Sequence, residues 1–229
     1  MKTLQDMTPN KKKAIFLTKR ELPVLVCDAV NLEGINYTLP EVQTLLDGVT
    51  VGGHKISDEM ITLNQAKAWN CLFSAVENEQ FALKKDFACT LHEIAAREES
   101  LEWGCFRSGS VTIAGTTYLP PKANMLDQLW IQMIHEFQNI KDVFDKAIFI
   151  FLQMARYQFF YDVNKRMGRF MMNGILLSEG YPAINLPAKR QLEFNQLMLN
   201  FYTSGDVEPM TTFMKSCFDQ RIIQIMSES

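Results

Sequence analysis

Residues 156–169 read Arg-Tyr-Gln-Phe-Phe-Tyr-Asp-Val-Asn-Lys-Arg-Met-Gly-Arg, and this stretch decides how the chain is interpreted. Asp162 is followed by three cations, Lys165, Arg166 and Arg169, where an apolar helical pattern begins. A helix N-terminus presents free amides and the positive end of its dipole to an anion. Arginine forks bind phosphate oxygens, and a carboxylate suits a hard cation such as magnesium. The stretch therefore predicts a site for a magnesium-bound polyphosphate.

The same stretch lacks side chains that remove protons. It contains no histidine, cysteine or serine, and the carboxamide of Gln158 has no useful proton affinity near neutral pH. The opposing interpretation is a helix with a solvated basic face, because lysine and arginine usually remain in water. These residues alone leave both interpretations open.

The chain is longer than a typical single domain, but its length and composition are compatible with a single core that carries an N-terminal extension. The chain has 229 residues, 47% of them apolar, and a net charge of −3, so neither nucleic acid nor a membrane surface is an expected partner. Five scattered cysteines show no paired metal-ligand spacing, which favours reduced thiols and a cytoplasmic location. The first residues lack the apolar core of a signal peptide, and no apolar run reaches the length of a membrane span.

Helical patterns dominate the chain. The segment 107–119 is the exception, because it alternates and carries turn residues, which predicts a β-hairpin. His92 has no neighbouring motif and is interpreted as structural. The predicted helices are Pro40–Leu46 after a Thr38 cap, Asp58–Glu77, Asp86–Ala96, Leu126–Asn139, Asp142–Tyr157, Lys165–Glu179, Ala188–Thr203 and Glu208–Met226.

The stretch resembles the signature of the Fic family, His-x-Phe-x-Asp/Glu-Gly-Asn-Gly/Lys-Arg-x-x-Arg. It differs at Gln158, where the family has histidine, and at Val163, where the family has its first glycine. We expect a β-branched residue at position 163 to resist a positive φ and to crowd a ligand. The matching positions are Phe160, Asp162, Asn164, Lys165, Arg166 and Arg169.

The resemblance implies a helical fold that binds ATP with Mg²⁺ and transfers AMP to a hydroxyl of a target protein. In the family the histidine is the general base and the acidic residue holds the metal, so Asp162 is the implied metal ligand and Gln158 stands in the catalytic position. The implied nucleotide-binding residues are Val163, Asn164, Lys165, Arg166, Gly168 and Arg169.

The predicted hairpin resembles the flap that lies beside the active site in the family and pairs with the target's backbone. Such an edge captures an extended peptide by adding a strand. The resemblance gives this role to residues 106–121, and to four of them in particular: Ser110, Val111, Thr112 and Ile113. An ordinary surface hairpin is the alternative.

Residues 28–42 resemble the inhibitory helix that some Fic proteins carry, with the pattern Ser/Thr-x-x-x-Glu-Gly/Asn. Glu33 and Gly34 match this pattern, whereas Ala29 replaces the hydroxyl residue. In the family this glutamate pairs with the last arginine of the signature, here Arg169, and obstructs the γ-phosphate.

The order of these segments predicts a mainly α fold, a Fic-type helical bundle with one β-hairpin flap. The expected division is an N-terminal helical extension over residues 1–80, with an inhibitory-like helix around 24–34, and a core over 81–229, with the signature loop at 158–169.

Two functions remain open. The first is a nucleotide- or phosphate-binding protein that is impaired in AMP transfer. The second is an active nucleotidyl- or phosphoryl-transferase that uses another base, since phosphoryl transfer depends mostly on positioning and charge stabilisation. A protein target is the implied partner, and a homo-oligomer is left open.

Overall fold

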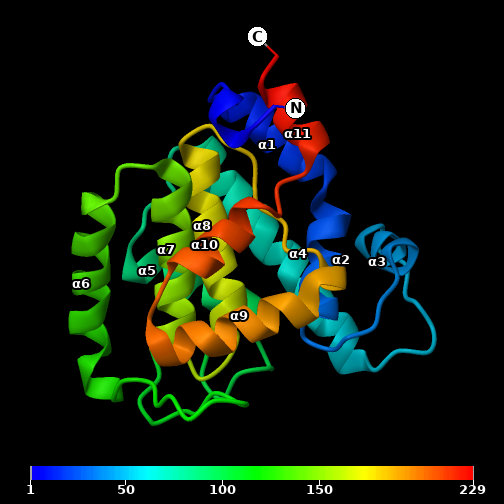
Figure 1. Ribbon diagram of the computed structural model, residues 1–229. Coiled ribbons are helices and arrows are strands. Elements are labelled where there is room, and N and C mark those ends of the chain that lie inside the picture. The colour runs from blue at the N-terminus through cyan, green and yellow to red at the C-terminus, as the bar shows by residue number, and fades with distance from the viewer. Residues whose placement is uncertain (1, 229) are drawn as a thin grey trace.

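The computed structural model describes residues 2–228 and is built almost entirely from helices (Figure 1). Three short 3-10 turns accompany the α-helices, at Leu4–Asp6, Ala123–Met125 and Ala188–Arg190. The α-helices of the described chain are α1 Lys11–Arg20, α2 Leu22–Asn31, α3 Leu39–Leu46, α4 Ile56–Glu77, α5 Lys85–Ala95, α6 Leu126–Asn139, α7 Val143–Tyr157, α8 Asn164–Ser178, α9 Gln191–Ser204, α10 Glu208–Lys215 and α11 Gln220–Met226.

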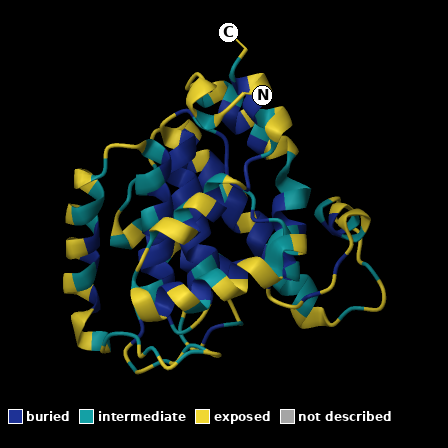
Figure 2. Cartoon of the chain, in the orientation of Figure 1, coloured by how far each residue is buried: buried dark blue, intermediate teal, exposed yellow. Residues whose placement is uncertain are grey.

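Helix α8 is the centre of the molecule. Thirteen of its fifteen residues are buried, and Figure 2 shows it dark blue along almost its whole length. It packs against α7, α4, α5 and α1. Two glycines allow this close packing: a Cβ on Gly168 would lie 2.8 Å from the carbonyl oxygen of Phe151, and one on Gly174 would lie 2.2 Å from the Phe81 ring.

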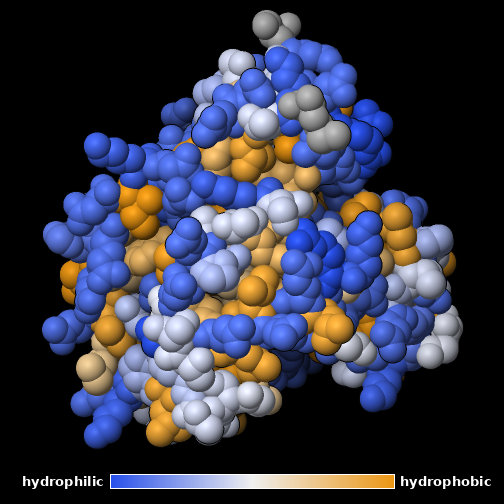
Figure 3. Space-filling view, viewed as in Figure 1, coloured by the Kyte–Doolittle hydropathy of each residue, from blue (hydrophilic) through white to orange (hydrophobic). Residues whose placement is uncertain are grey.

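Hydrophilic and apolar side chains are distributed over the surface as in most globular proteins. On the face shown in Figure 3, hydrophilic side chains form most of the outline and apolar side chains show between them towards the middle. None of the helices in the described residues is both long enough and apolar enough to span a bilayer.

Most of the predicted helices are present, with one correction near the C-terminus and one helix that was not predicted. Thr38 caps α3 as expected, because its hydroxyl accepts from the amide of Glu41 while the Glu41 carboxylate accepts from Thr38. The single helix expected over 208–226 is two helices, because Asp219 caps a new one by accepting from the amide of Arg221. Helix α1 was not predicted.

The inhibitory-like helix expected around 24–34 ends earlier. Helix α2 stops at Asn31, and Glu33 lies in the turn that follows it. Gly34 takes φ +84°, a left-handed conformation that glycine adopts without cost. The glutamate therefore projects from a turn rather than from a helix.

The predicted β-hairpin flap is wrong in its secondary structure. Residues 106–121 contain no strand, and the described chain as a whole contains none. The segment is an extended loop with a turn at Ala114–Gly115, at the lower end of the molecule in Figure 1. An isolated two-stranded hairpin has little stability of its own, and here the guanidinium of Arg107 joins the two ends of the loop by donating to the carbonyls of Gly109 and Pro121, at 2.6 and 2.5 Å.

Candidate functional site

A pocket of about 420 Å³ opens between the N-terminus of α8, the 106–121 loop and α9. The signature loop forms the floor of the pocket. The 106–121 loop and α9 form its walls, and Glu33 lies at one side. Its lining residues are Glu33, Thr112, Ile113, Ala114, Gln158, Asp162, Val163, Asn164, Lys165, Asn195, Met198, Leu199 and Tyr202.

The signature loop is shaped by two residues in the left-handed backbone region. Gln158 ends α7 at φ 52°, and Val163 precedes α8 at φ 64°. Val163 adopts the positive φ that glycine would take, so the resistance expected of valine takes the form of backbone strain. A β-branched residue there stores about 1–3 kcal/mol of strain. Its side chain is buried and forms part of the pocket wall.

The carboxamide of Gln158 is bonded at both ends. Its Nε2 donates to the carbonyl of Ala155 at 2.6 Å, and its Oε1 accepts from Nδ2 of Asn164 at 3.0 Å. Asn164 also bonds both backbone groups of Phe160. These contacts fix the loop, and they give Gln158 a structural part in it.

Asp162 is exposed at the pocket. Its Oδ1 accepts from the amide of Val163 at 2.6 Å.

His92 supports the signature loop from behind Asp162. Its Nε2 lies 3.3 Å from the Asp162 carbonyl, and its Nδ1 accepts from the amide of Gly104. The His92 ring is fully buried and stacks on Phe160. Burial lowers the pKa of His92 to about 4, so the ring is neutral at pH 7 and supports the loop from behind.

Glu33 faces two cations of α8. One carboxylate oxygen lies 3.7 Å from Lys165 Nζ, and the other lies 3.7 Å from Arg169 Nη2. Burial alone would raise the pKa of Glu33, but Lys165, Arg166 and Arg169 outweigh it and hold the pKa below its usual value. Glu33 is therefore a charged carboxylate that lies against both cations.

Arg166 is bound to a carboxylate that the sequence analysis did not single out. Its two terminal nitrogens donate to the two oxygens of Glu99, with 2.9 Å between Nη1 and Oε2. Only 3% of Arg166 is exposed. The expectation that this side chain ends in solvent or in the pocket is wrong. A fork of this kind fixes both partners, so the pair holds the loop after α5 against α8.

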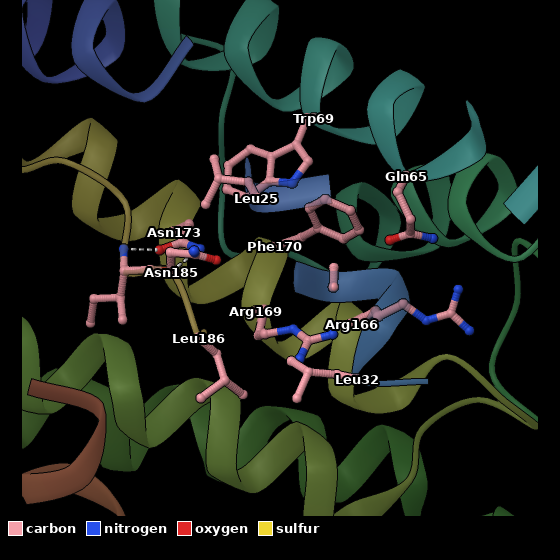
Figure 4. Close-up of a pocket in the computed structure, with 12 residues that line it drawn as sticks. Leu25, Leu32, Gln65, Trp69, Arg166, Arg169, Phe170, Asn173, Asn185 and Leu186 are labelled. Carbon is pink, nitrogen blue, oxygen red and sulfur yellow. Dashed lines mark hydrogen bonds between the residues drawn. The ribbon is translucent and has the colours of Figure 1, made fainter. Parts of the chain in front are cut away.

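The predicted nucleotide-binding residues divide into two groups. Val163, Asn164 and Lys165 line the pocket, together with Gln158 and Asp162. Arg166, Gly168 and Arg169 do not line it: the two arginines face a separate small cavity (Figure 4), and Gly168 faces Phe151 of α7. Of the predicted flap residues, Thr112 and Ile113 line the pocket, whereas Ser110 and Val111 do not.

Several site residues were missed by sequence reasoning. Asn195, Met198 and Tyr202 of α9 form a pocket wall, but their helical spacing is that of any packed helix. Arg107 is 2% exposed, and its Nε donates to the carbonyl of Gln158 at 2.6 Å. Nothing in the sequence separated Glu99 from the acidic residues beside it.

Metal-binding groups are sparse within residues 2–228. No cluster of three or more histidine, cysteine or acidic residues is placed to hold an ion. Asp162 therefore offers one carboxylate, and any hard cation there would need further oxygen ligands from a bound molecule.

Comparison with known proteins agrees with this geometry. Residues 82–176 match the family model of the Fic/DOC family. Among curated proteins, the protein adenylyltransferase Fic of Drosophila mojavensis is 23% identical over 199 residues, covering 85% of this chain and 39% of the relative. The chain thus spans about two-fifths of the length of that relative.

Solved structures share the fold. Fic-1 of C. elegans (residues 134–508) aligns with a TM-score of 0.77 at 19% identity, covering 89% of this chain and 63% of that one. A Fic domain signalling protein from Bacteroides thetaiotaomicron aligns with a TM-score of 0.75 at 17% identity, covering 97% and 91%. Residues 82–176 therefore match the Fic/DOC family, and the chain shares the fold of these Fic structures.

Proposed function

We propose that the chain binds a nucleotide or phosphate in the pocket at the N-terminus of α8, and that it is impaired in AMP transfer. The observation that carries the proposal is the composition of the pocket. It combines the exposed carboxylate of Asp162, the cation of Lys165 and the first turn of a helix with a neutral carboxamide, Gln158, at the family's base position. These groups hold charge and do not remove a proton.

The impairment rests on Gln158 and Val163. The oxygen of the Gln158 carboxamide is already bonded to Asn164 and its nitrogen to Ala155, so it neither accepts a proton nor turns freely towards a hydroxyl. Loss of a positioned base lowers a rate by roughly 10²–10⁴-fold. Val163 adds side-chain atoms to the pocket wall where the family has glycine, which leaves less room beside a bound phosphate.

ATP with Mg²⁺ fits this donor set. Magnesium is commonly bound by one or two carboxylates together with phosphate oxygens and water, and a single exposed Asp162 matches that pattern. When bound, the ion would neutralise phosphate charge. Lys165 and the α8 N-terminus would hold the phosphates, and the apolar part of α9, with Met198 and Tyr202, would cover the remainder of the ligand.

Glu33 is the proposed inhibitory residue. It occupies the space beside Lys165 and Arg169 that the anionic end of a triphosphate would need.

The 106–121 loop is the proposed contact with a protein target, because Thr112 and Ile113 of this loop line the pocket. The Drosophila relatives are named protein adenylyltransferases, so the proposed target is a protein, and the resemblance to the Fic family implies that the target supplies a hydroxyl.

An active nucleotidyl- or phosphoryl-transferase is the second candidate. It is favoured by the retention of Asp162 and Lys165 in the pocket, because metal and charge can do most of the work of phosphoryl transfer. In this case metal activation of the target hydroxyl replaces the missing base.

Calorimetry with ATP, ADP and AMP in magnesium tests the binding proposal. Glu33→Gln removes the charge that competes with phosphate, so we expect ATP to bind more tightly by roughly 5- to 100-fold, equivalent to about 1–3 kcal/mol, with a much smaller change for AMP. Glu208→Gln, at an exposed position, is the control for loss of one negative charge. Equal ATP affinities for the parent and Glu33→Gln would contradict the inhibitory role, and absence of binding to every form would contradict the nucleotide site.

A further inference from the structure

Two cysteines from different segments, Cys89 of α5 and Cys105 of the loop that follows, line one pocket at the surface. The pocket has a volume of about 420 Å³ and lies between the first turns of α5, the segment 104–108 and the N-terminus of α6. It shares no lining residue with the nucleotide pocket. Both thiols are free, with Cys105 exposed and Cys89 partly buried.

The segment 104–106 begins against the second half of α5. The amide of Gly104 donates to Nδ1 of His92 at 3.2 Å. A Cβ built on Gly104 would lie 3.2 Å from the Cβ of Glu93, which is closer than side chains normally approach. The backbone of the segment therefore lies directly on the helix at this point, with no layer of side chains between them.

The same segment ends against the first turn of α5, where Nζ of Lys85 lies 4.5 Å from the centre of the Phe106 ring. Positions 85, 89 and 93 follow one another on one face of the helix, because four residues make about one turn. The segment thus runs antiparallel to α5. Its middle residue, Cys105, lies opposite Cys89, the middle position of that face.

The two thiols differ in their access to a dissolved oxidant. Burial raises the pKa of the Cys89 thiol to about 11, while Lys85 acts in the opposite direction and a negative charge on Cys105 raises it further. Cys89 is therefore protonated at neutral pH and reacts slowly with solutes, since the thiolate is the nucleophile. Cys105 is exposed and reacts first.

We propose that Cys89 and Cys105 are a reversible modification site, a dithiol that is oxidised to a disulfide by low-molecular-weight disulfides such as glutathione disulfide. The Cys105 thiolate attacks one sulfur of glutathione disulfide, whose S–S bond breaks and releases one glutathione. Cys89 then loses its proton to solvent, attacks the Cys105 sulfur and displaces the second glutathione. The protein gives up two electrons and two protons, and glutathione disulfide is reduced to two glutathione molecules.

The disulfide would join α5 to a segment that supports the signature loop. Cys105 lies between Gly104, which bonds His92, and Arg107, whose amide donates to the carbonyl of Phe159 at 2.9 Å. Oxidation therefore adds a covalent tie where these two residues now hold the loop by hydrogen bonds. The site is separate from the nucleotide pocket and stands whether or not the chain binds a nucleotide.

The test is non-reducing peptide mapping of the full chain. Reduced protein is incubated with glutathione disulfide, the remaining thiols are alkylated, and tryptic peptides are identified by mass spectrometry. Arg97 is exposed and lies between the two cysteines, so trypsin separates Cys89, in peptide 86–97, from Cys105, in peptide 98–107.

Three serine variants complete the experiment. Cys89→Ser removes the thiol that closes the disulfide, and Cys105→Ser removes the thiol that reacts first. Cys71→Ser is the matched control, because it removes another partly buried thiol, on α4, that does not line this pocket. Circular dichroism confirms the fold of each variant.

In the parent we expect two of the five free thiols to be lost, a mass lower by about 2 Da, and a link between peptides 86–97 and 98–107 that dithiothreitol breaks. Cys71→Ser gives the same link. Cys89→Ser instead keeps one glutathione on peptide 98–107. In Cys105→Ser, glutathione is added to peptide 86–97 at least roughly tenfold more slowly than to peptide 98–107 in Cys89→Ser.

Two results would overturn the proposal. A parent chain that keeps glutathione on Cys105 and never forms the link would show that the two sulfurs do not meet. A parent chain in which Cys105 instead forms a disulfide between two copies of the chain, seen as a dimer on a non-reducing gel, would assign the reactivity to a single exposed thiol.

Discussion

Arg166 shows how a residue can match a motif and still have a different environment from the one expected. Its guanidinium is buried and forked onto Glu99, whereas Lys165, one residue earlier, lines the pocket. On a helix, consecutive side chains point in directions about 100° apart, so neighbouring cations in one motif need not reach one ligand. In the proposed phosphate site, Lys165 is therefore the one of these two cations that lines the pocket.

Glu99→Gln tests the importance of this pair. Breaking one partner of a buried ion pair leaves an uncompensated charge, which costs about 3–5 kcal/mol. We expect a fall of this size in the free energy of unfolding, measured by urea denaturation. Glu98→Gln, at an exposed neighbouring position, should change stability by less than about 0.5 kcal/mol. Equal midpoints for the two variants would show that the Glu99–Arg166 pair contributes nothing.

His92 predicts a pH dependence of stability. Its folded pKa is about 4 and its ordinary value is 6.5, so between these values the unfolded chain binds more protons than the folded chain. Stability is therefore fully present above pH 6.5 and falls as the pH drops towards 4, by about 3 kcal/mol. His92→Gln should flatten this part of the profile in urea denaturation, whereas exposed His135→Gln should not. An unchanged slope in His92→Gln would assign the acid sensitivity to other groups.

At the scale of elements, hydrophobic periodicity predicted most of the helices that surround the site. It did not separate α10 from α11, because the apolar spacing runs on through the break that the Asp219 cap creates. It also predicted a hairpin at 106–121, since alternation and turn residues describe an extended loop equally well. Whether such a segment forms a strand depends on hydrogen bonds to a neighbouring strand, and the local sequence pattern does not show whether that neighbour is present.

Arg107 is the residue that gives this loop its shape, because it bonds carbonyls at both ends of the loop and in the signature segment. Arg107→Met removes these charge-assisted bonds, so we expect cleavage between residues 108 and 120 to accelerate by roughly tenfold or more in limited proteolysis. Exposed Arg97→Met is the control. Unchanged cleavage of Arg107→Met would mean that the loop is held by other contacts.

At the scale of the whole molecule, the sequence supported the fold and the location of the pocket. Asp162, Lys165 and Glu33 were predicted from motif positions, and the structure places them around one space because α2, α8 and the signature loop converge there. The pairing of Glu99 with Arg166 and the position of Cys105 opposite Cys89 depend on contacts between separate segments, which spacing along the chain does not encode.

The transfer of label from [α-³²P]ATP to protein, with magnesium present, tests the central claim most directly. The parent chain and Glu33→Gly should transfer no AMP to themselves or to proteins of a lysate, because no base removes the hydroxyl proton at Gln158. Gln158→His alone should recover little while Val163 remains. The triple change Gln158→His, Val163→Gly and Glu33→Gly should recover measurable transfer, since it restores the base, opens the pocket wall and removes the competing carboxylate. Robust transfer by the unaltered chain would contradict the account and favour a transferase that uses another base.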